Sequence, residues 1–325
     1  MMLVMTLLVR DEGDILREHL DYHLNAGVDL VVATDHRSQD GTTELLQSYA
    51  REGVLILLRE DGEFAQQAAW QTRMARLAAS EYGADWIIHS DADEFWWPRG
   101  ASLKDALTPV PHRFGVVYGL MQNFVPHLES HGWFVERMTV RLAGAAPIND
   151  PATPFRPVTK VAHRGDPRVV MQKGGGHQVF GVEGDSLRAW HPFEVLHFPF
   201  RSREQSVTKY RKTWTGWERN LRGDLARARS ASDQGRIDAM WTRIALDDAA
   251  VRRGLEAGWL VVDVRLRDAF RRLRGTGGQP AGTADRAQLE AGVFEAAVFE
   301  EAEVVRFQRW TDEIQRRLSG LESRP

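Results

Sequence analysis

The sequence predicts an α/β protein in which a mostly parallel sheet is flanked by helices and followed by a helical C-terminal region. In the first 98 residues, short apolar runs alternate with longer segments of helical periodicity, in the order β-α-β-α-β-α-β. The apolar runs are hydrophobic on both faces, which is typical of parallel strands covered by helices. Because 43% of the 325 residues are hydrophobic, the chain can build a large core.

The elements of this first region have recognisable ends. The predicted strands cover residues 3–9, 30–34, 54–58 and 86–90. The predicted helices cover residues 14–26, 43–51 and 64–82. Each helix is followed by a glycine that stops it, namely Gly27, Gly53 and Gly83.

The pattern is less regular between residues 99 and 200. The expected strands there are 116–120, 138–142, 160–163 and 169–171, and the last pair leads into a run of three glycines at 174–176. We therefore predict one domain over residues 1–200, with halves at 1–98 and 99–200. A helical extension over 201–325 follows it, with a linker at 275–282 and an amphipathic pattern at 289–318.

Charge is unevenly placed along the chain. Residues 201–280 carry 18 Lys and Arg against 10 Asp and Glu, whereas residues 1–200 carry 18 against 26. A basic segment can meet a diphosphate, an anionic acceptor or a membrane surface, although the interspersed acids favour solvated helix faces. We expect the last helices to pack on the first domain, with subunit pairing or peripheral membrane contact as alternatives. No nucleic-acid-binding module is recognisable, so no nucleic-acid partner is predicted.

The chain has no cysteine, which excludes disulfides, zinc-thiolate sites and thiol nucleophiles. The apolar opening at residues 1–9 is too short to span a bilayer and lacks the features of a signal peptide. We therefore predict a buried strand there and a cytoplasmic protein, with membrane association as the second expectation.

Charged residues follow all four predicted strands of the first region. In a parallel sheet, ligands bind outside the carboxyl ends of the strands. The four charged segments are Arg10-Asp11-Glu12, Asp35-His36-Arg37, Arg59-Glu60-Asp61 and Asp91-Ala92-Asp93-Glu94. Acids at such positions also cap helices, which is the expected role of Asp14 and Asp40. Four charged segments at one edge indicate a binding site rather than caps alone.

The last of these segments predicts a cation site. In an extended chain, Asp91 and Asp93 point the same way while Glu94 faces elsewhere. Two carboxylates suit Mg²⁺ or Mn²⁺, which proteins hold together with substrate phosphates. The chain contains neither G-x-G-x-x-G after the first strand nor a P-loop, so a metal would have to hold the phosphates. A solvated turn that caps a strand is the alternative interpretation.

Three segments together resemble a known family: LLVRDEGDILREHLDYHLNAGVD at 7–29, TDHRSQDGT at 34–42 and WIIHSDADEF at 86–95. They are similar to the nucleotide-sugar-binding half of family 2 glycosyltransferases, in the bacterial subgroup with a D-x-D-E-F motif. The resemblance extends more loosely through 160–177 and 197–212. It implies the Rossmann-like glycosyltransferase A fold, Mn²⁺ or Mg²⁺, and transfer of a sugar from a nucleoside diphosphate to a glycan, lipid-linked or protein acceptor, mostly with inversion.

The resemblance also implies roles for particular residues. By position, Glu12 and Asp35 would contact the nucleoside of the donor, and Asp91 and Asp93 would lie at the metal and ribose, with Asp93 preferred as the direct ligand.

Further residues are assigned to the same site. The predicted catalytic residues are Asp91, Asp93 and Glu94, and the predicted metal ligands are Asp91, Asp93 and His197, with His177 as a rival to His197. Arg10, His36 and Arg73 are predicted to bind the donor together with Glu12 and Asp35. We expect a UDP-sugar first, but His36 stands where many relatives have Asp or Asn, which leaves base recognition open.

Other roles stay open at the level of sequence. An inverting reaction needs a base, for which Glu94, Asp150, Glu183, Asp185 and Glu194 are the alternatives. The cations after His197 can neutralise a leaving diphosphate: Arg201, Arg203, Lys209, Arg211 and Lys212. Trp96 and Trp97 either face a sugar ring or form a wall of the core.

Two other functions remain as alternatives to a glycosyltransferase. One is a metal-dependent nucleotidyltransferase, although its first loop would usually be glycine-rich and basic, whereas residues 10–14 are mainly acidic. The other is a non-catalytic sugar-binding or scaffold protein with the same fold.

Overall fold

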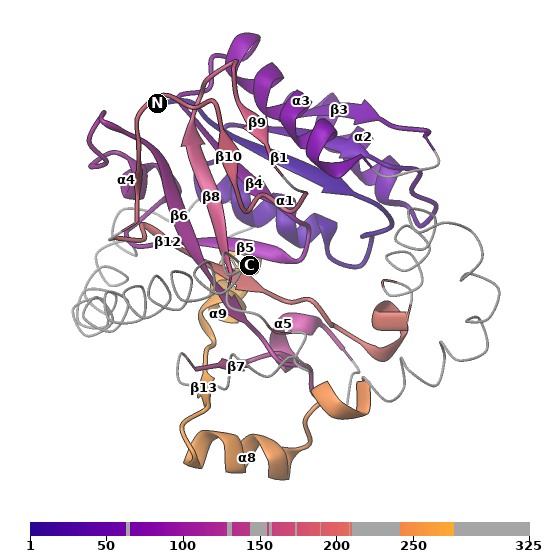
Figure 1. Ribbon diagram of the computed structural model, residues 1–325. Helices are drawn as coiled ribbons and strands as arrows, with labels where there is room; N and C mark the ends of the chain where they lie inside the picture. Colours follow the sequence, from indigo (N-terminus) through magenta and orange to yellow (C-terminus); the bar gives the residue numbers. More distant parts are fainter. Residues whose placement is uncertain are drawn as a thin grey trace, which may run out of the picture.

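The computed structural model describes residues 1–62, 66–128, 132–143, 155, 158–172, 174–188, 190–207, 209 and 241–275. Its main strands are β1 (Leu3–Val9), β2 (Leu30–Asp35), β3 (Leu55–Arg59), β4 (Trp86–Ser90), β5 (Glu94–Pro98), β6 (Phe114–Asn123), β8 (Thr159–Arg164), β11 (Asp185–Leu187) and β12 (Phe193–His197). Within the described residues these nine strands form one sheet, most of whose strands are labelled in Figure 1. Their order is β3-β2-β1-β4-β8-β6-β12-β5, with β11 beside β6. The predicted α/β class, with a mostly parallel sheet flanked by helices, is confirmed.

The first half of the sheet is parallel, as the alternation of elements predicted. Strand β1 lies at its centre and pairs in parallel with β2 on one side and β4 on the other. Strand β3 adds in parallel to the far side of β2. The carboxyl ends of these strands therefore lie along one edge, where the charged segments follow them.

Helices cover both faces of this half: α1 (Leu16–Asn25) and α2 (Thr42–Arg51) on one face, and α3 (Gln67–Ser80) on the other. Alternating residues of β1 divide between the two layers, since Leu3 and Met5 pack with α1 and α2 whereas Val4 packs with α3. All three are fully buried. The two-sided hydrophobic character of the strand is thus explained by a helix layer on each side.

The second half of the sheet contains antiparallel pairs. Strand β8 runs antiparallel to both β4 and β6, so β6 has the same direction as β4. Strand β12 is parallel to β6 and antiparallel to β5, and its last residue, His197, lies opposite Asn123 on one side and Glu94 on the other. This register brings residues far apart in the sequence to the same edge of the sheet.

Smaller elements complete this region: α4 (Leu103–Leu107), the short helix α5 (Phe134–Arg137), and a hairpin formed by β9 (Val170–Met171) and β10 (Val179–Phe180). Its two strands lie on either side of the run of three glycines in the sequence. It leaves one apolar cross-strand pair, Val170 and Phe180, exposed.

The described part of the C-terminal region is not helical throughout. It contains α8 (Asp248–Glu256) and α9 (Arg265–Gly275), but also β13 (Leu260–Val262), which pairs antiparallel with β7 (Val140–Leu142). Figure 1 shows β7, β13 and α8 together at one end of the molecule, away from α2 and α3. The segments predicted as a linker and an amphipathic helix, 275–282 and 289–318, lie outside the described residues except for Gly275.

Helix α9 packs on the main core, whereas the last predicted helices, at 289–318, lie outside the described residues. Phe270 is buried, and its ring centroid lies 6.1 Å from that of Tyr22, 5.9 Å from Phe95 and 5.5 Å from Trp133. This aromatic cluster joins α9 to α1 and to β5. No described helix is long and apolar enough to cross a membrane.

The change Phe270→Ala should lower the free energy of unfolding by about 3–5 kcal/mol, because it removes a buried ring that contacts Tyr22, Phe95 and Trp133. Urea denaturation followed by circular dichroism measures this loss. Phe180→Ala is the control, since Phe180 is 48% exposed and its truncation should change stability by no more than about 0.5 kcal/mol. Equal effects of the two changes would contradict the packing of α9 on the core.

Candidate active site

The acidic segment after β4 forms a turn rather than an extended strand end. The backbone N–H of Glu94 donates to the carbonyl of Asp91 at 3.1 Å, and the backbone N–H of Asp91 donates to the Glu94 carboxylate at 3.0 Å. The expectation that Asp91 and Asp93 face one point while Glu94 faces elsewhere is therefore wrong. The turn instead brings Asp91 and Glu94 to a common partner, Lys160, and directs Asp93 to a different set of residues.

Asp93, Glu94 and His197 form a possible ligand cluster, in which one oxygen or nitrogen atom of each lies within 4.8 Å of the others. His197 donates from Nδ1 to the side-chain oxygen of Asn123 at 2.8 Å, which leaves Nε2 as the acceptor atom of the neutral ring. Nε2 lies 3.8 Å from Oδ2 of Asp93. Burial lowers the pKa of His197 to about 4, so the ring is neutral at physiological pH.

Two cations face Asp93 from the segment after β12. Lys209 donates a hydrogen bond from Nζ to Oδ2 of Asp93, and Nη1 of Arg201 lies 4.0 Å from the same oxygen. Burial opposes ionisation of Asp93, but these two cations hold its pKa well below the usual range. Arg201 is itself fixed by Glu12 at 2.9 Å and by Asp14 at 2.8 Å.

Lys160 forms the other centre of the site. It lies on β8 with a side chain only 1% exposed, and Nζ contacts Asp91 at 2.8 Å and Glu94 at 2.7 Å. Burial opposes its charge, but the two carboxylates raise the pKa of Lys160 above its ordinary value. No role was predicted for this lysine from the sequence. The available signal was a lysine within the predicted strand at 160–163.

The donor set fits a divalent cation. The cluster offers carboxylate oxygens and one imidazole nitrogen, a combination that suits Mn²⁺. A hydrogen bond from Nδ1 to Asn123 fixes the histidine ring, as outer partners of metal-binding histidines do. Among the described residues, five carboxyl groups face three permanent cations, and the site has excess negative charge only when Glu12 and Glu94, whose pKa values burial raises, are also ionised. The carboxylates are those of Glu12, Asp14, Asp91, Asp93 and Glu94, and the cations are Lys160, Arg201 and Lys209.

The stability of the metal-free protein should fall as the pH rises from about 5 to about 8. Burial raises the pKa of Glu94 from 4.5 to about 8, and Asp91 and Asp93 act in the same sense while Lys160 opposes them. In this interval the native state therefore binds more protons than the unfolded state, which makes the slope negative. Urea denaturation in EDTA at several pH values, on the wild type and Glu94→Gln, measures the contribution. We expect the variant to lose this part of the slope; identical slopes would contradict the assignment.

The residues predicted to bind the donor are mostly engaged in local structure. Asp35 accepts hydrogen bonds from the Thr43 hydroxyl and from the backbone of Ser38. His36 is buried; its Nε2 lies 2.8 Å from the carbonyl of Gly62, and its ring packs against Trp70.

Arg10, Arg73 and Glu12 complete the predicted donor residues. Arg10 is exposed at the end of β1, and Arg73 forms an ion pair with Glu60 at 2.6 Å. Glu12 joins the acidic cluster through Arg201. Of the five predicted donor residues, Glu12 is therefore the one that an ion pair links to the Asp93 cluster.

The structure also shows the positions of other residues that were candidates from the sequence. Trp96 and Trp97 are buried in the core, so they do not face a ligand. Glu194 is buried, and its carboxylate accepts hydrogen bonds from Arg265 and Gln122. Glu183 and Asp185 are exposed. Asp150, Arg211 and Lys212 lie outside the described residues.

The glycine run brings the backbone close to the sheet. A Cβ atom on Gly176 would lie 2.6 Å from Cβ of His89, and φ at this residue is +66°. Glycine is therefore required here by both space and conformation. His177, the rival metal ligand, instead places Nδ1 at 2.8 Å from the carbonyl of Thr159.

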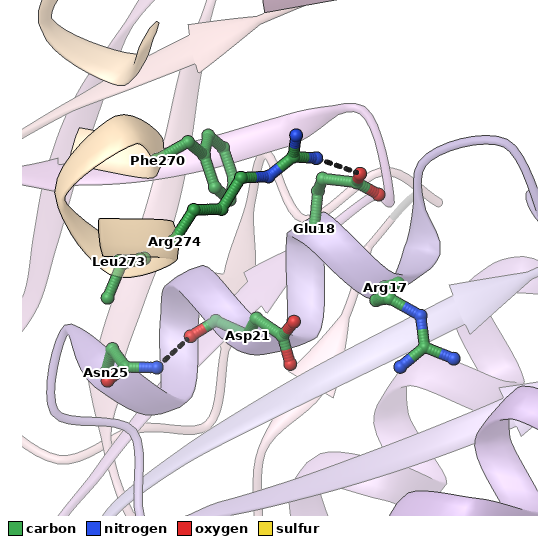
Figure 2. Close-up of a pocket in the computed structure, with 7 residues that line it drawn as sticks. All are labelled: Arg17, Glu18, Asp21, Asn25, Phe270, Leu273 and Arg274. Atoms are coloured by element: carbon green, nitrogen blue, oxygen red, sulfur yellow. Dashed lines mark hydrogen bonds and ion pairs between the residues drawn. The ribbon is translucent and has the colours of Figure 1, made fainter. Parts of the chain in front are cut away.

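A separate pocket of about 320 Å³ lies between α1 and α9 (Figure 2). Asn25 and Asp21 line it from α1, and Phe270, Leu273 and Arg274 from α9. Figure 2 shows Arg274 crossing toward Glu18, with which it forms an ion pair at 3.7 Å. The pocket contains none of the acidic cluster, so we do not assign the chemistry to it.

Comparison with known proteins gives partial structural likenesses. No protein-family profile and no curated protein matches the chain. Among solved structures, S. aureus TarS 1–349 in complex with UDP has 13% identity and a TM-score of 0.35, with 64% of each chain covered. The same TarS fragment in complex with UDP-GlcNAc has 14% identity and a TM-score of 0.29, with 41% of this chain and 36% of that chain covered. In the latter comparison the match thus spans about a third of the TarS chain.

Proposed function

We propose that this protein is a metal-dependent glycosyltransferase that moves a sugar from a nucleoside diphosphate to a glycan, lipid-linked or protein acceptor with inversion. The observation that carries the proposal is the cluster of Asp93, Glu94 and His197 with Arg201 and Lys209 at one edge of the sheet. This edge holds the carboxyl ends of β1, β4, β6 and β12, where α/β sheets bind ligands. The site combines donors for a cation with cations for a diphosphate.

Asp93 and His197 would hold Mn²⁺ or Mg²⁺ together with phosphate oxygens of the donor, with Glu94 as a further donor. When bound, the metal would supply Lewis-acid stabilisation of the departing diphosphate. Arg201 and Lys209 add positive charge on the same side, and Glu12 and Asp14 fix the direction of the Arg201 guanidinium.

The acceptor hydroxyl needs a base within reach. Asp91 is the accessible carboxylate of the acidic turn, with 41% of its side chain exposed, whereas Glu94 is 2% exposed. We therefore assign proton acceptance to Asp91, which Lys160 holds in place at 2.8 Å. This differs from the bases considered from the sequence, because the turn buries Glu94 and leaves Asp91 open.

A thermal-shift panel with UDP, GDP, CDP and dTDP, each with and without Mn²⁺, tests the proposal. UDP is the first choice, since a UDP-sugar donor is expected. A ligand that binds the native state at 100 times its dissociation constant stabilises it by about 2.7 kcal/mol. We expect one nucleotide to raise the melting temperature only when Mn²⁺ is present. If no nucleotide does so, the transferase proposal fails and a non-catalytic scaffold becomes the better account.

We also propose a cytoplasmic location, with membrane contact through the basic C-terminal helices as the second proposal.

A further inference from the structure

Lys209 and His197 both face the same carboxylate oxygen, Oδ2 of Asp93. The Lys209 ammonium donates to Oδ2 of Asp93, and this oxygen lies 3.8 Å from Nε2 of His197. The Asp93 side chain is only 5% exposed, so few other groups can reach it. One Asp93 oxygen is therefore both the atom that faces the histidine nitrogen and the acceptor for a lysine.

We propose that Lys209 is a built-in competitor of the divalent cation: it neutralises Asp93 in the metal-free protein and must leave Oδ2 before a metal can use that oxygen. This inference rests on the proposed function of the same site. An ammonium and a divalent ion cannot share one carboxylate oxygen without strong mutual repulsion, since the site is largely screened from water. Competition for Asp93 therefore makes metal binding alone weak.

Lys209 is more exposed than Arg201 and, within the described part of the chain, is paired less firmly. Arg201 is 3% exposed and held by two carboxylates, Glu12 and Asp14. The Lys209 side chain is 33% exposed, and its other hydrogen bond given by the structure, to the carbonyl of Pro199 at 3.4 Å, is long. Lys209 is thus the cation that can leave Asp93, while Arg201 stays in place.

A displaced ammonium near a buried site needs another anion. The diphosphate of a nucleotide is the anion that would arrive together with the metal, and lysine binds phosphate as a point charge. Metal and nucleoside diphosphate should therefore bind cooperatively, each tightening the other by the same factor. The lysine would thereby favour loading of the complete metal–nucleotide pair over the metal alone.

Electron paramagnetic resonance of free Mn²⁺ measures metal binding directly, without reference to activity. The proteins to compare are the wild type, Lys209→Gln, Lys209→Met and Lys209→Arg. Lys104→Gln is the matched control, since Lys104 pairs with Asp29 at 2.5 Å on the surface. Without nucleotide, we expect the Gln and Met variants to bind Mn²⁺ at least about tenfold more tightly than the wild type, because one competing charge is gone. The Arg variant and the control should match the wild type.

Addition of UDP completes the experiment. UDP should tighten Mn²⁺ binding to the wild type by a larger factor than binding to the Gln and Met variants. Equal Mn²⁺ affinity of the wild type and these two folded variants without nucleotide would overturn the inference. If instead the variants bind Mn²⁺ more tightly but UDP has no effect on any protein, the competition stands and the proposed function fails.

Discussion

Lys160→Met should lower the free energy of unfolding by about 3–5 kcal/mol, because it leaves buried negative charge without its partner. Lys160 is 1% exposed and contacts Glu94, which is 2% exposed, at 2.7 Å. Methionine is similar in length to lysine, so the substitution leaves little empty space. The loss of stability should therefore come mainly from removal of the positive charge. Urea denaturation at about pH 9, where Glu94 is ionised because its pKa is raised to about 8, measures this loss in the presence of EDTA.

Two further variants show whether charge is the cause. The double change Lys160→Met with Glu94→Gln removes both members of the buried pair and should recover much of the lost stability. Lys104→Met breaks an exposed pair with Asp29 and should cost only about 0–1 kcal/mol. A loss of stability in Lys160→Met that persists fully in the double variant would contradict a role in neutralising Glu94.

Asp93→Asn should reduce sugar transfer by at least about a hundredfold, because metal stabilisation of the leaving group is worth several kcal/mol. The change keeps the size of the side chain but removes the charge that Lys209 and Arg201 share. Release of UDP from a UDP-sugar in the presence of Mn²⁺ and acceptor measures the rate. The same protein should also lose Mn²⁺-dependent stabilisation by UDP.

Asp166→Asn is a suitable control for this substitution. Asp166 is also a buried aspartate paired with arginine, contacting Arg168 at 2.7 Å, but it lies on the loop between β8 and β9. We expect its variant to retain both transfer and UDP stabilisation. Retention of activity in Asp93→Asn would contradict the assignment of this residue to the site.

The first half of the fold was predictable because local pattern and tertiary structure agree there. The strands β1 to β4 are apolar on both faces and each intervening helix has an amphipathic stripe, so periodicity alone identified the parallel sheet. The second half depends on pairing between distant strands, such as His197 of β12 opposite both Glu94 and Asn123. Such register is fixed by packing of the whole sheet and is not visible in a local window.

The site was predicted in part for the same reason. Asp93 and Glu94 follow a clearly predicted strand, and His197 lies at the end of an apolar run. Their positions were therefore sufficient to predict them as site residues. A turn at this segment was considered only as a solvated cap of the strand, and the different partners that it gives Asp91 and Asp93 were not predicted. No role was predicted for Lys160, because an isolated lysine in a strand does not show which carboxylates lie beside it in the fold. Its two partners are Asp91, in the turn after β4, and Glu94, at the start of β5.

Anomalous diffraction from crystals grown with Mn²⁺ and UDP would locate the metal, the nucleotide and Lys209 together. We expect a manganese peak within bonding distance of Asp93 Oδ2 and His197 Nε2 and close to the phosphate oxygens of UDP, with Lys209 moved from Asp93 to the diphosphate. Manganese and UDP bound elsewhere, with Lys209 still on Asp93, would contradict both the proposed metal site and the role of Lys209.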